Sequence, residues 1–236
     1  MTNTNKPIIS RRSRPAKAPL SKETIITTAL ELLRKDGLTG LSMRKVAVAL
    51  DTGPASLYVY VANLNELNGY VLDLALGDVI LPSGHEGPWK TRLLDLLQSY
   101  LSILYQSPGL AELAQTTIPS GSNYLQIMET ILGILVEAGL ESTAAAWGVD
   151  LLLLYATSVA FEQSSRDHNG IGMDPLANII NSLDSVKFPH IFNLKTPLFS
   201  GGETRFKWGL EIIMNGILHT PSPSLHEWTA PENHTK

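Results

Sequence analysis

Hydrophobic positions recur every three or four residues along almost the whole chain, with polar positions between them. This is the spacing of an amphipathic α-helix, in which such positions fall on one face. No stretch alternates apolar and polar residues for long enough to predict a β-strand. The pattern therefore predicts an all-α protein.

Helix boundaries follow from the residues that favour helix ends. Ser21, Ser42 and Asn63 are suited to cap helices, and Pro54 suits a first helical turn. Glu66 follows Asn63 by three residues, which is the capping-box pattern. The expected helices cover residues 21–36, 42–50, 54–60, 63–81, 88–106, 108–116, 121–138, 142–166, 174–186 and 202–218, and the expected loops cover 167–173 and 196–202.

Charge is distributed unevenly along the 236 residues, although the net charge is only −4. The first 22 residues contain six Lys or Arg side chains and no acidic residue, so the rest of the chain is acidic overall. A basic end on an acidic body indicates that one end meets phosphate and the other does not.

Several protein classes are disfavoured by composition. The chain has no cysteine, which excludes disulfides, thiolate metal sites and a cysteine nucleophile. The basic residues at 11–17 are not followed by the apolar segment of a signal peptide. The longest apolar stretch, 147–161, contains Asp150 and is shorter than the roughly 20 residues of a bilayer span. We therefore expect a cytoplasmic protein without a membrane partner.

The three short helices near the N-terminus, with a three-residue break at 51–53, match what a DNA-reading module requires. One helix lies in the major groove, and the helix before it crosses the phosphate backbone. Ala55 is small enough to approach a thymine methyl group. The side chains able to donate to phosphates or base edges are Ser42, Arg44, Lys45, Ser56, Tyr58 and Tyr60. The alternative is a small helical subdomain with a solvated basic face.

The runs LSMRKVAVAL at 41–50 and PASLYVYV at 54–61 resemble the TetR family of bacterial regulators. The resemblance spans 21–76, with the Leu-Tyr pair at 57–58, Arg44 and both caps in register. A weaker resemblance, at 188–191 and 202–217, is to the tetracycline-repressor branch. The resemblance implies that residues of both helices contact DNA. The candidate contacts are Arg11, Arg12 and Arg14 of the basic arm and Ser42, Arg44, Lys45, Thr52, Gly53, Pro54, Ala55, Ser56, Tyr58 and Tyr60.

The sequence departs from the family pattern at three positions. Asp51 replaces the usual turn glycine, at a position that tends to be left-handed. Tyr60 replaces a frequent histidine, and Leu64 replaces a common Lys or Arg, which removes one usual phosphate contact. The basic arm can compensate by entering the minor groove, as homeodomain arms do. The alternative is that the arm is a solvated tail.

A two-fold protein places its recognition helices about 34–36 Å apart, one turn of DNA. The resemblance implies that two late helices form a four-helix interface between chains. From spacing alone, the apolar residues of these two helices can equally belong to the core of a single chain. The candidate interface residues are Leu151, Leu154, Ser158 and Phe161 on one helix and Leu210, Ile213, Met214 and Ile217 on the other.

The resemblance also implies a small-molecule pocket in the body. Large side chains on helices expected to face the bundle interior favour a flat, largely apolar ligand. Core packing is the alternative for each of them. The candidates are Trp89, Tyr100, Leu104, Tyr124, Met128, Trp147, Leu151 and Tyr155. A metal-dependent tetracycline site is not expected, because the counterpart of its fourth-helix histidine falls near Ile80.

Catalytic, metal and cofactor sites are not expected. None of the six histidines lies three or four residues from another histidine or a carboxylate, and no G-x-S-x-G or phosphate-loop motif occurs. An enzyme and a helical adaptor with weakened DNA binding remain the alternatives.

Taken together, the sequence predicts a DNA-binding head followed by a larger helical ligand-binding and dimerisation bundle. We expect a disordered basic arm at 1–20, a helix-turn-helix domain at 21–67, the bundle at 68–219 and a flexible tail at 220–236. The expected function is that of a homodimeric regulator associated with the bacterial nucleoid. A small effector would release it from a palindromic operator by swinging the fourth helix.

Overall fold

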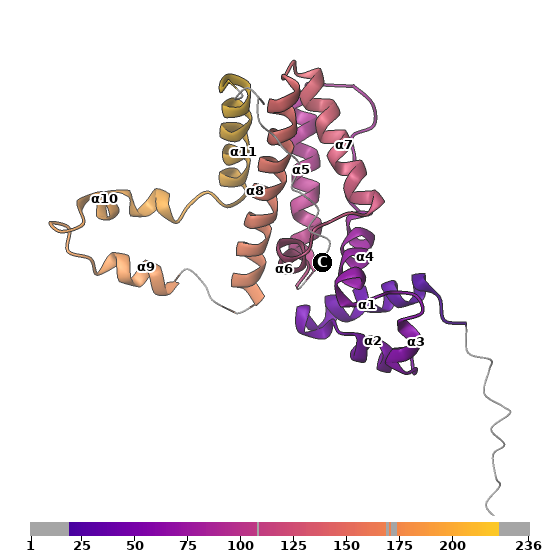
Figure 1. Cartoon of the computed structure of the whole chain (residues 1–236). Coiled ribbons are helices and arrows are strands. Elements are labelled where there is room, and N and C mark those ends of the chain that lie inside the picture. The colour runs from indigo at the N-terminus through magenta and orange to yellow at the C-terminus, as the bar shows by residue number, and fades with distance from the viewer. Residues whose placement is uncertain (1–18, 108, 169, 171–173, 222–236) are drawn as a thin grey trace, which may run out of the picture.

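The computed structural model describes residues 19–107, 109–168, 170 and 174–221, in which helices are the only regular elements. A small head lies at the lower end of an elongated helical body (Figure 1). The all-α prediction is confirmed. The elements are α1 (Lys22–Asp36), η2 (Leu38–Gly40), α2 (Met43–Ala49), α3 (Pro54–Leu57), α4 (Leu64–Leu76), α5 (Trp89–Gln106), α6 (Leu110–Thr116), α7 (Ser122–Glu137), α8 (Ser142–His168), α9 (Asp174–Asn181), α10 (Pro189–Leu198) and α11 (Gly202–His219).

The three predicted helix caps of the head are formed. Side-chain oxygens of Ser21, Ser42 and Asn63 each accept the backbone N–H three residues later, at 3.1, 3.2 and 2.9 Å. The Glu66 carboxylate accepts the N–H of Ala62, one residue earlier than a capping box requires. These caps satisfy orphan donors at the starts of α1, α2 and α4.

The break between α2 and α3 contains a left-handed residue, as the sequence predicts. Asp51 has a φ of 50°. The N–H of Thr52 donates to the carbonyl of Ala47 at 2.9 Å, and that of Asp51 to Val48 at 3.0 Å. These two bonds form a Schellman ending of α2, which turns the chain sharply towards α3.

Each helix of the head contributes buried side chains to the hydrophobic core, which continues into the body. Ile25 and Leu33 of α1, Val46 of α2, Leu57 of α3 and Leu67 of α4 are fully buried. Burial of each such side chain contributes about 1.5–3 kcal/mol. The core therefore holds α2 and α3 at a fixed angle to each other without using the side chains of their outer faces.

The body is organised around α8, which contacts α5, α6, α7 and α11. Within the described part of the chain, only α8 is long and apolar enough to cross a membrane by length and composition. Its contacts instead make it the central helix of the bundle. Tyr100 of α5 and Thr157 of α8 share a buried hydrogen bond of 2.9 Å, and burial raises the pKa of Tyr100 to about 12.

Helix α4, which leads from the head into the body, is tied to the start of α7 by Asp73. The Asp73 carboxylate accepts the backbone N–H groups of Asn123 and Tyr124, both at 3.0 Å. The Asn123 side-chain amide donates to the carbonyl of Asp73 at 2.8 Å. Helix α7 has no side-chain cap of its own, because its N-cap residue is Gly121. Asp73 thus caps a helix distant in sequence.

Removing the Asp73 carboxylate is expected to destabilise the body. We expect Asp73→Ala to lower the free energy of unfolding by about 1 kcal/mol, the usual effect of losing a helix cap. Gly121→Ala should act on the same contact, because an added Cβ would lie 1.9 Å from the Asp73 carboxyl carbon. Urea unfolding of both single variants and the double variant measures this. Effects that simply add would show that the two residues act separately.

The head and body also meet at Gly109, just before α6. Gly109 has a φ of 77°, and a Cβ placed on it would lie 2.4 Å from the backbone nitrogen of Leu38. Element η2, which contains Leu38, contacts α6. The two backbones therefore approach more closely than any side chain at this position would allow.

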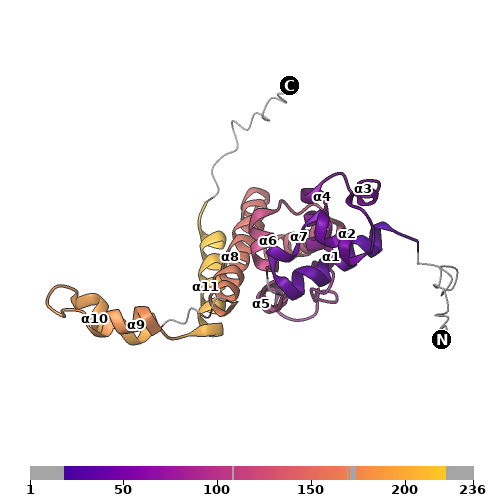
Figure 2. The same cartoon turned by 90° about the horizontal axis from the view of Figure 1, so that it is seen from below.

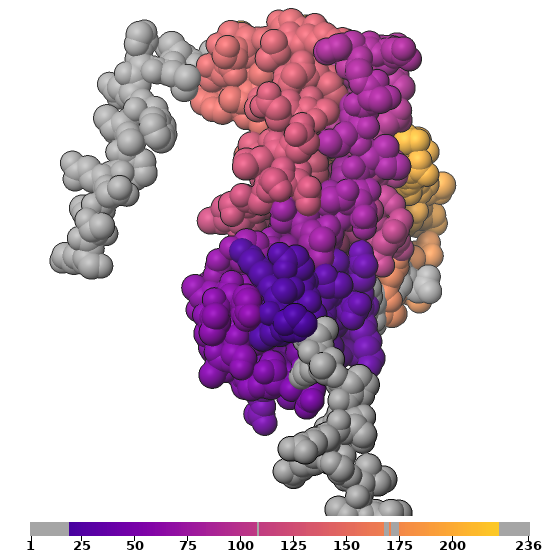
Figure 3. Space-filling view, turned by 90° about the vertical axis from the view of Figure 1, so that its right-hand side faces the viewer, coloured from indigo at the N-terminus to yellow at the C-terminus, as the bar shows by residue number. Residues whose placement is uncertain are grey.

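Helices α9 and α10 form an arm that extends away from the bundle (Figures 1 and 2). Their principal contacts are with each other. Several apolar side chains on the arm are exposed, among them Ile179 at 58% and Leu194 at 54%. The arm contrasts with the compact head and bundle seen from the side in Figure 3.

Two predictions for this region were wrong. The helix predicted at 174–186 ends at Asn181, because the Asp184 carboxylate accepts the N–H of Val186 at 2.8 Å and favours a turn. Helix α10 was not predicted, and it includes residues 196–198 of an expected loop. Pro189 occupies its first turn, where proline is tolerated.

Two helices of the head are shorter than predicted. Helix α3 ends at Leu57 rather than at 60, where the N–H groups of Tyr60 and Val61 both bond to the Leu57 carbonyl in a tight turn. Helix α4 ends at Leu76 rather than at 81. Ile80 donates its N–H to the Ser99 hydroxyl at 2.8 Å and thereby leaves the helical path.

Candidate DNA-binding surface and helical body

The outer face of the helix-turn-helix carries the predicted DNA contacts. Arg44 is exposed on α2, and Tyr58 and Tyr60 follow α3 with exposed fractions of 53% and 36%. Every predicted contact from Ser42 to Tyr60 is exposed or partly exposed. Arg11, Arg12 and Arg14 lie outside the described residues. The predicted contacts of α2, α3 and the turn between them are thus accessible to a partner, while Leu57 among them stays buried.

Two predicted contacts already have partners within the head. The Lys45 ammonium donates to the Thr39 carbonyl at 2.7 Å, and the Ser42 hydroxyl accepts the Lys45 N–H. Lys45 must therefore exchange its bond before it can reach a phosphate. Among the described residues no carboxylate pairs with Arg44, so its guanidinium is available to a ligand.

The predicted pocket residues do not line one cavity. Tyr100 and Leu104 are buried core residues, whereas Trp89, Tyr124, Met128 and Tyr155 are partly buried and pack against that core. The expectation that all eight face the interior was wrong for Trp147 and Leu151, each 48% exposed. These two lie on the side of α8 that faces away from the core.

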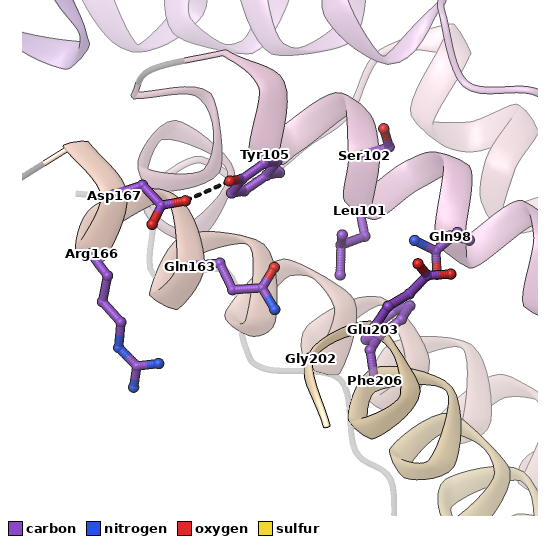
Figure 4. Close-up of a pocket in the computed structure, with 10 residues that line it drawn as sticks. All are labelled: Gln98, Leu101, Ser102, Tyr105, Gln163, Arg166, Asp167, Gly202, Glu203 and Phe206. Carbon is purple, nitrogen blue, oxygen red and sulfur yellow. Dashed lines mark hydrogen bonds between the residues drawn. The ribbon is translucent and has the colours of Figure 1, made fainter. Parts of the chain in front are cut away.

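A groove does lie in the body, between α5, the last turns of α8 and the start of α11 (Figure 4). It has a volume of about 540 Å³. We call it the α5–α8–α11 groove. Most of its lining residues are polar or charged, whereas the sequence led us to expect large apolar and aromatic ones. The lining residues are Gln98, Leu101, Ser102, Tyr105, Gln163, Arg166, Asp167, Gly202, Glu203 and Phe206.

An apolar face runs along α8 and α11. Leu154 and Phe161, both predicted interface residues, are exposed at 53% and 36%. Leu210 and Met214, predicted for the same interface, are instead buried in the core of the monomer. Their corrected role is to pack α11 against the bundle. Ile213 and Ile217 are partly buried and line a shallow cavity of about 370 Å³ with Trp147 and Leu151, while the predicted Ser158 is exposed.

An ionic cluster at the opposite end of the body was missed by sequence spacing. The carboxylate of Glu137, at the end of α7, pairs with the buried Arg92 and contacts His85 at 2.8 Å. The Arg92 guanidinium, and then His85, hold the pKa of Glu137 below its usual range. The partners are 45 and 52 residues away from Glu137, so no local motif marks them. Arg92 also donates to the carbonyl of Gly84, which fixes the loop before α5.

No group of three or more His, Cys, Asp or Glu residues suited to a metal ion occurs within the described part of the chain. The site that the geometry does present is a folded helix-turn-helix with an exposed polar face, mounted on a helical body. These features define a DNA-binding transcriptional regulator. Residues 81–220 match the sequence model of the tetracycline repressor-like C-terminal domain, and the chain belongs to the TetR family.

Relatives of known type agree with this assignment. The HTH-type transcriptional repressor DrrR1 of Streptomyces coeruleorubidus is 27% identical over 223 residues, which cover 88% of this chain and 80% of the relative. The class D tetracycline repressor of Escherichia coli is 26% identical over 205 residues, covering 85% of this chain and 90% of the relative.

The fold of this chain closely resembles those of solved structures. The crystal structure of apo ActR from Streptomyces coelicolor aligns with a TM-score of 0.79 at 38% identity, covering 86% of this chain and 97% of ActR. ActR has also been crystallised with actinorhodin, and that structure aligns with a TM-score of 0.78 at 38% identity, covering 85% of this chain and 96% of ActR.

Proposed function

We propose that the chain acts as a homodimeric repressor that binds a palindromic operator and leaves it when a small molecule binds the body. The observation that carries this proposal is the exposed set of Arg44, Tyr58 and Tyr60 on a head whose helices are held by buried side chains. A structural subdomain would not require aromatic side chains at these exposed positions. The repressor relatives and the TetR fold support the same function.

Dimerisation is proposed through α8 and α11. Leu154, Phe161 and Trp208 are large apolar side chains that remain exposed on this face, with Trp208 at 62%. A second copy of the chain would bury them and form a four-helix interface. The proposed domain division is a head of residues 21–67 and a body of residues 68–219, with action on DNA in the bacterial cytoplasm.

Effector binding is proposed because ActR, which has the same fold, has been crystallised with the small molecule actinorhodin. We assign the binding to the body, which is the larger part of the chain and lies outside the head. The helices that join head and body, α4 and α6, both contact α7 or α8. A ligand that prefers one arrangement of the body therefore changes operator affinity through these helices.

The two alternative functions fit the structure less well. An adaptor that has lost DNA binding is suggested by the residues at Asp51 and Leu64, but Asp51 makes the required turn and Leu64 packs against the core. For an enzyme, we propose no catalytic residue. Loss of salt-dependent DNA binding would identify the adaptor.

Selection of bound DNA from a random pool tests the proposed function. We expect a palindrome whose half-sites are about 10 base pairs apart, one helical turn. The control is Leu154→Arg, which places a charge on the proposed interface without disturbing the head. This variant should sediment as a monomer and should no longer enrich palindromes. Recovery of no preferred sequence by the native chain would favour the adaptor.

A further inference from the structure

The α5–α8–α11 groove continues into a second cavity of about 350 Å³, which shares Gln163, Arg166 and Phe206 with it. Phe206 stacks on Tyr155 with ring centroids 5.6 Å apart and an interplanar angle of 6°. Leu101 adds an aliphatic surface to the lining. Most of each of these side chains is buried, so the groove offers a narrow apolar wall along which an aromatic ring can pack.

The charged and phenolic hydrogen-bond donors at the groove are already used within the chain. An anionic ligand would have to displace these bonds before it could pair with a cationic side chain. The pairs are Tyr105 with Asp167 at 2.5 Å, Arg166 with Glu162, Lys207 with Glu203 at 2.7 Å, and Arg205 with the carbonyls of Pro197 and Leu198 at 2.9 Å each.

Hydrogen-bond acceptors, in contrast, are left over. The side-chain oxygen of Gln98 is buried and has no hydrogen-bond partner among the described residues. Asp167 and Glu203 each use one carboxylate oxygen in the pairs above, and no described residue donates to the other. Buried oxygens without a partner are uncommon, and Gln98 lines the groove, so a small movement of its side chain would let this oxygen accept a hydrogen bond from a ligand.

The surrounding charge favours a cation. In Figure 4 the Arg166 side chain points away from the other residues, whereas Gln98 and Glu203 lie at one end and Asp167 at the other. Asp95 of α5 adds another negative charge near Lys207. Among the residues that line the groove, the two carboxylates of Asp167 and Glu203 outnumber the single cation, Arg166.

We propose that this groove is the effector site and that its ligand is a flat aromatic molecule carrying a protonated amine. The ring packs along Leu101 and Phe206. The ammonium group donates to Gln98 and Glu203, and a second donor on the ligand reaches Asp167. This assignment rests on the proposed function, in which the body binds an effector.

Three naphthalene probes with different side groups test the assignment without DNA. Naphthylmethylamine is cationic at neutral pH, naphthylmethanol is neutral and naphthylacetate is anionic. We expect fluorescence titration of the full chain to show the amine binding about fivefold tighter than the alcohol, the effect of a partly exposed ion pair. The acetate should bind more weakly than both.

Variants then locate the binding. Asp167→Asn with Glu203→Gln should abolish the preference for the amine, and each single variant should reduce it. Glu129→Gln, which removes one negative charge from the exposed surface of α7, should preserve it. Gln98→Leu should weaken amine binding without lowering the free energy of unfolding, because the oxygen it removes has no partner in the chain. If Gln98 has a purely structural role, Gln98→Leu should instead lower the free energy of unfolding.

The outcomes separate this proposal from the proposed function. Equal binding of all three probes, absence of binding, or a preference that persists in the Asp167 and Glu203 variants would overturn the groove assignment. Operator release is measured separately, by anisotropy of labelled selected DNA. Binding of the amine in the groove with no ligand effect on DNA would contradict only the proposed function.

Discussion

A Gly109→Ala variant is expected to be less stable than the native chain and to bind its operator more weakly. Placing alanine in the left-handed region costs about 1–2 kcal/mol on its own. The added Cβ would also lie 2.4 Å from the backbone nitrogen of Leu38, so the head must move relative to the body. Urea unfolding measures the first effect, and titration of labelled selected DNA measures the second.

Gly133→Ala is the matched control. Gly133 lies within α7, and a Cβ placed there would meet nothing within 4 Å. Alanine at this position should stabilise the chain by about 0.5–1 kcal/mol, since alanine favours the helix more than glycine does. If Gly109→Ala were as stable as the native chain, the contact between η2 and α6 would have to deform easily. This contact would then not set the position of the head.

Arg44→Ala and Tyr58→Ala are expected to weaken operator binding without unfolding the head. Both side chains are exposed, and a specific contact to a base contributes about 1–3 kcal/mol, so each variant should lose about fivefold to 150-fold in affinity. Titrations at several salt concentrations measure this. A phosphate contact by Arg44 would also reduce the salt dependence, whereas Tyr58 would leave it almost unchanged.

Lys90→Ala controls for loss of positive charge, because Lys90 is exposed at the start of α5 in the body. It should bind the operator like the native chain. The thermal unfolding midpoint of Tyr58→Ala tests whether this side chain contributes to the stability of the head. A large drop there would mean that Tyr58 stabilises the head, and would contradict its assignment to the DNA-reading face.

The head was more predictable than the body because its signals are local. Ser21, Ser42 and Asn63 bond to backbone three residues away, so their spacing alone reveals them. Asp51 is similar, because left-handed conformations restrict residue choice at one position. The Asp73 cap of α7 links residues 50 and 51 apart, and nothing in the sequence near either partner indicates it.

The apolar faces of the body were the hardest to interpret. Helix α8 has one face against the core, with Leu152 buried, and another with Leu151 and Leu154 exposed. Hydrophobicity is the same on both faces, so periodicity could not distinguish the interior from a surface left for a partner. The same ambiguity placed Leu210 and Met214 at an interface and Trp147 in a pocket. The α5–α8–α11 groove was not predicted because its residues come from three separate helices.

The Asp73 tie has a geometric consequence for how far the head can travel. Helix α4 has 13 residues, which at 1.5 Å per residue gives a rod of about 20 Å. Asp73 fixes this rod near its C-terminal end, and the head is attached at the other. Leu64, at the head end, lies about 14 Å from Asp73 along the helix, so a rotation of only about 10° around Asp73 would displace that end by about 2 Å, more than half the rise of one base pair. The tie acts as a fulcrum, so a sub-ångström movement near α7 is enlarged at the DNA.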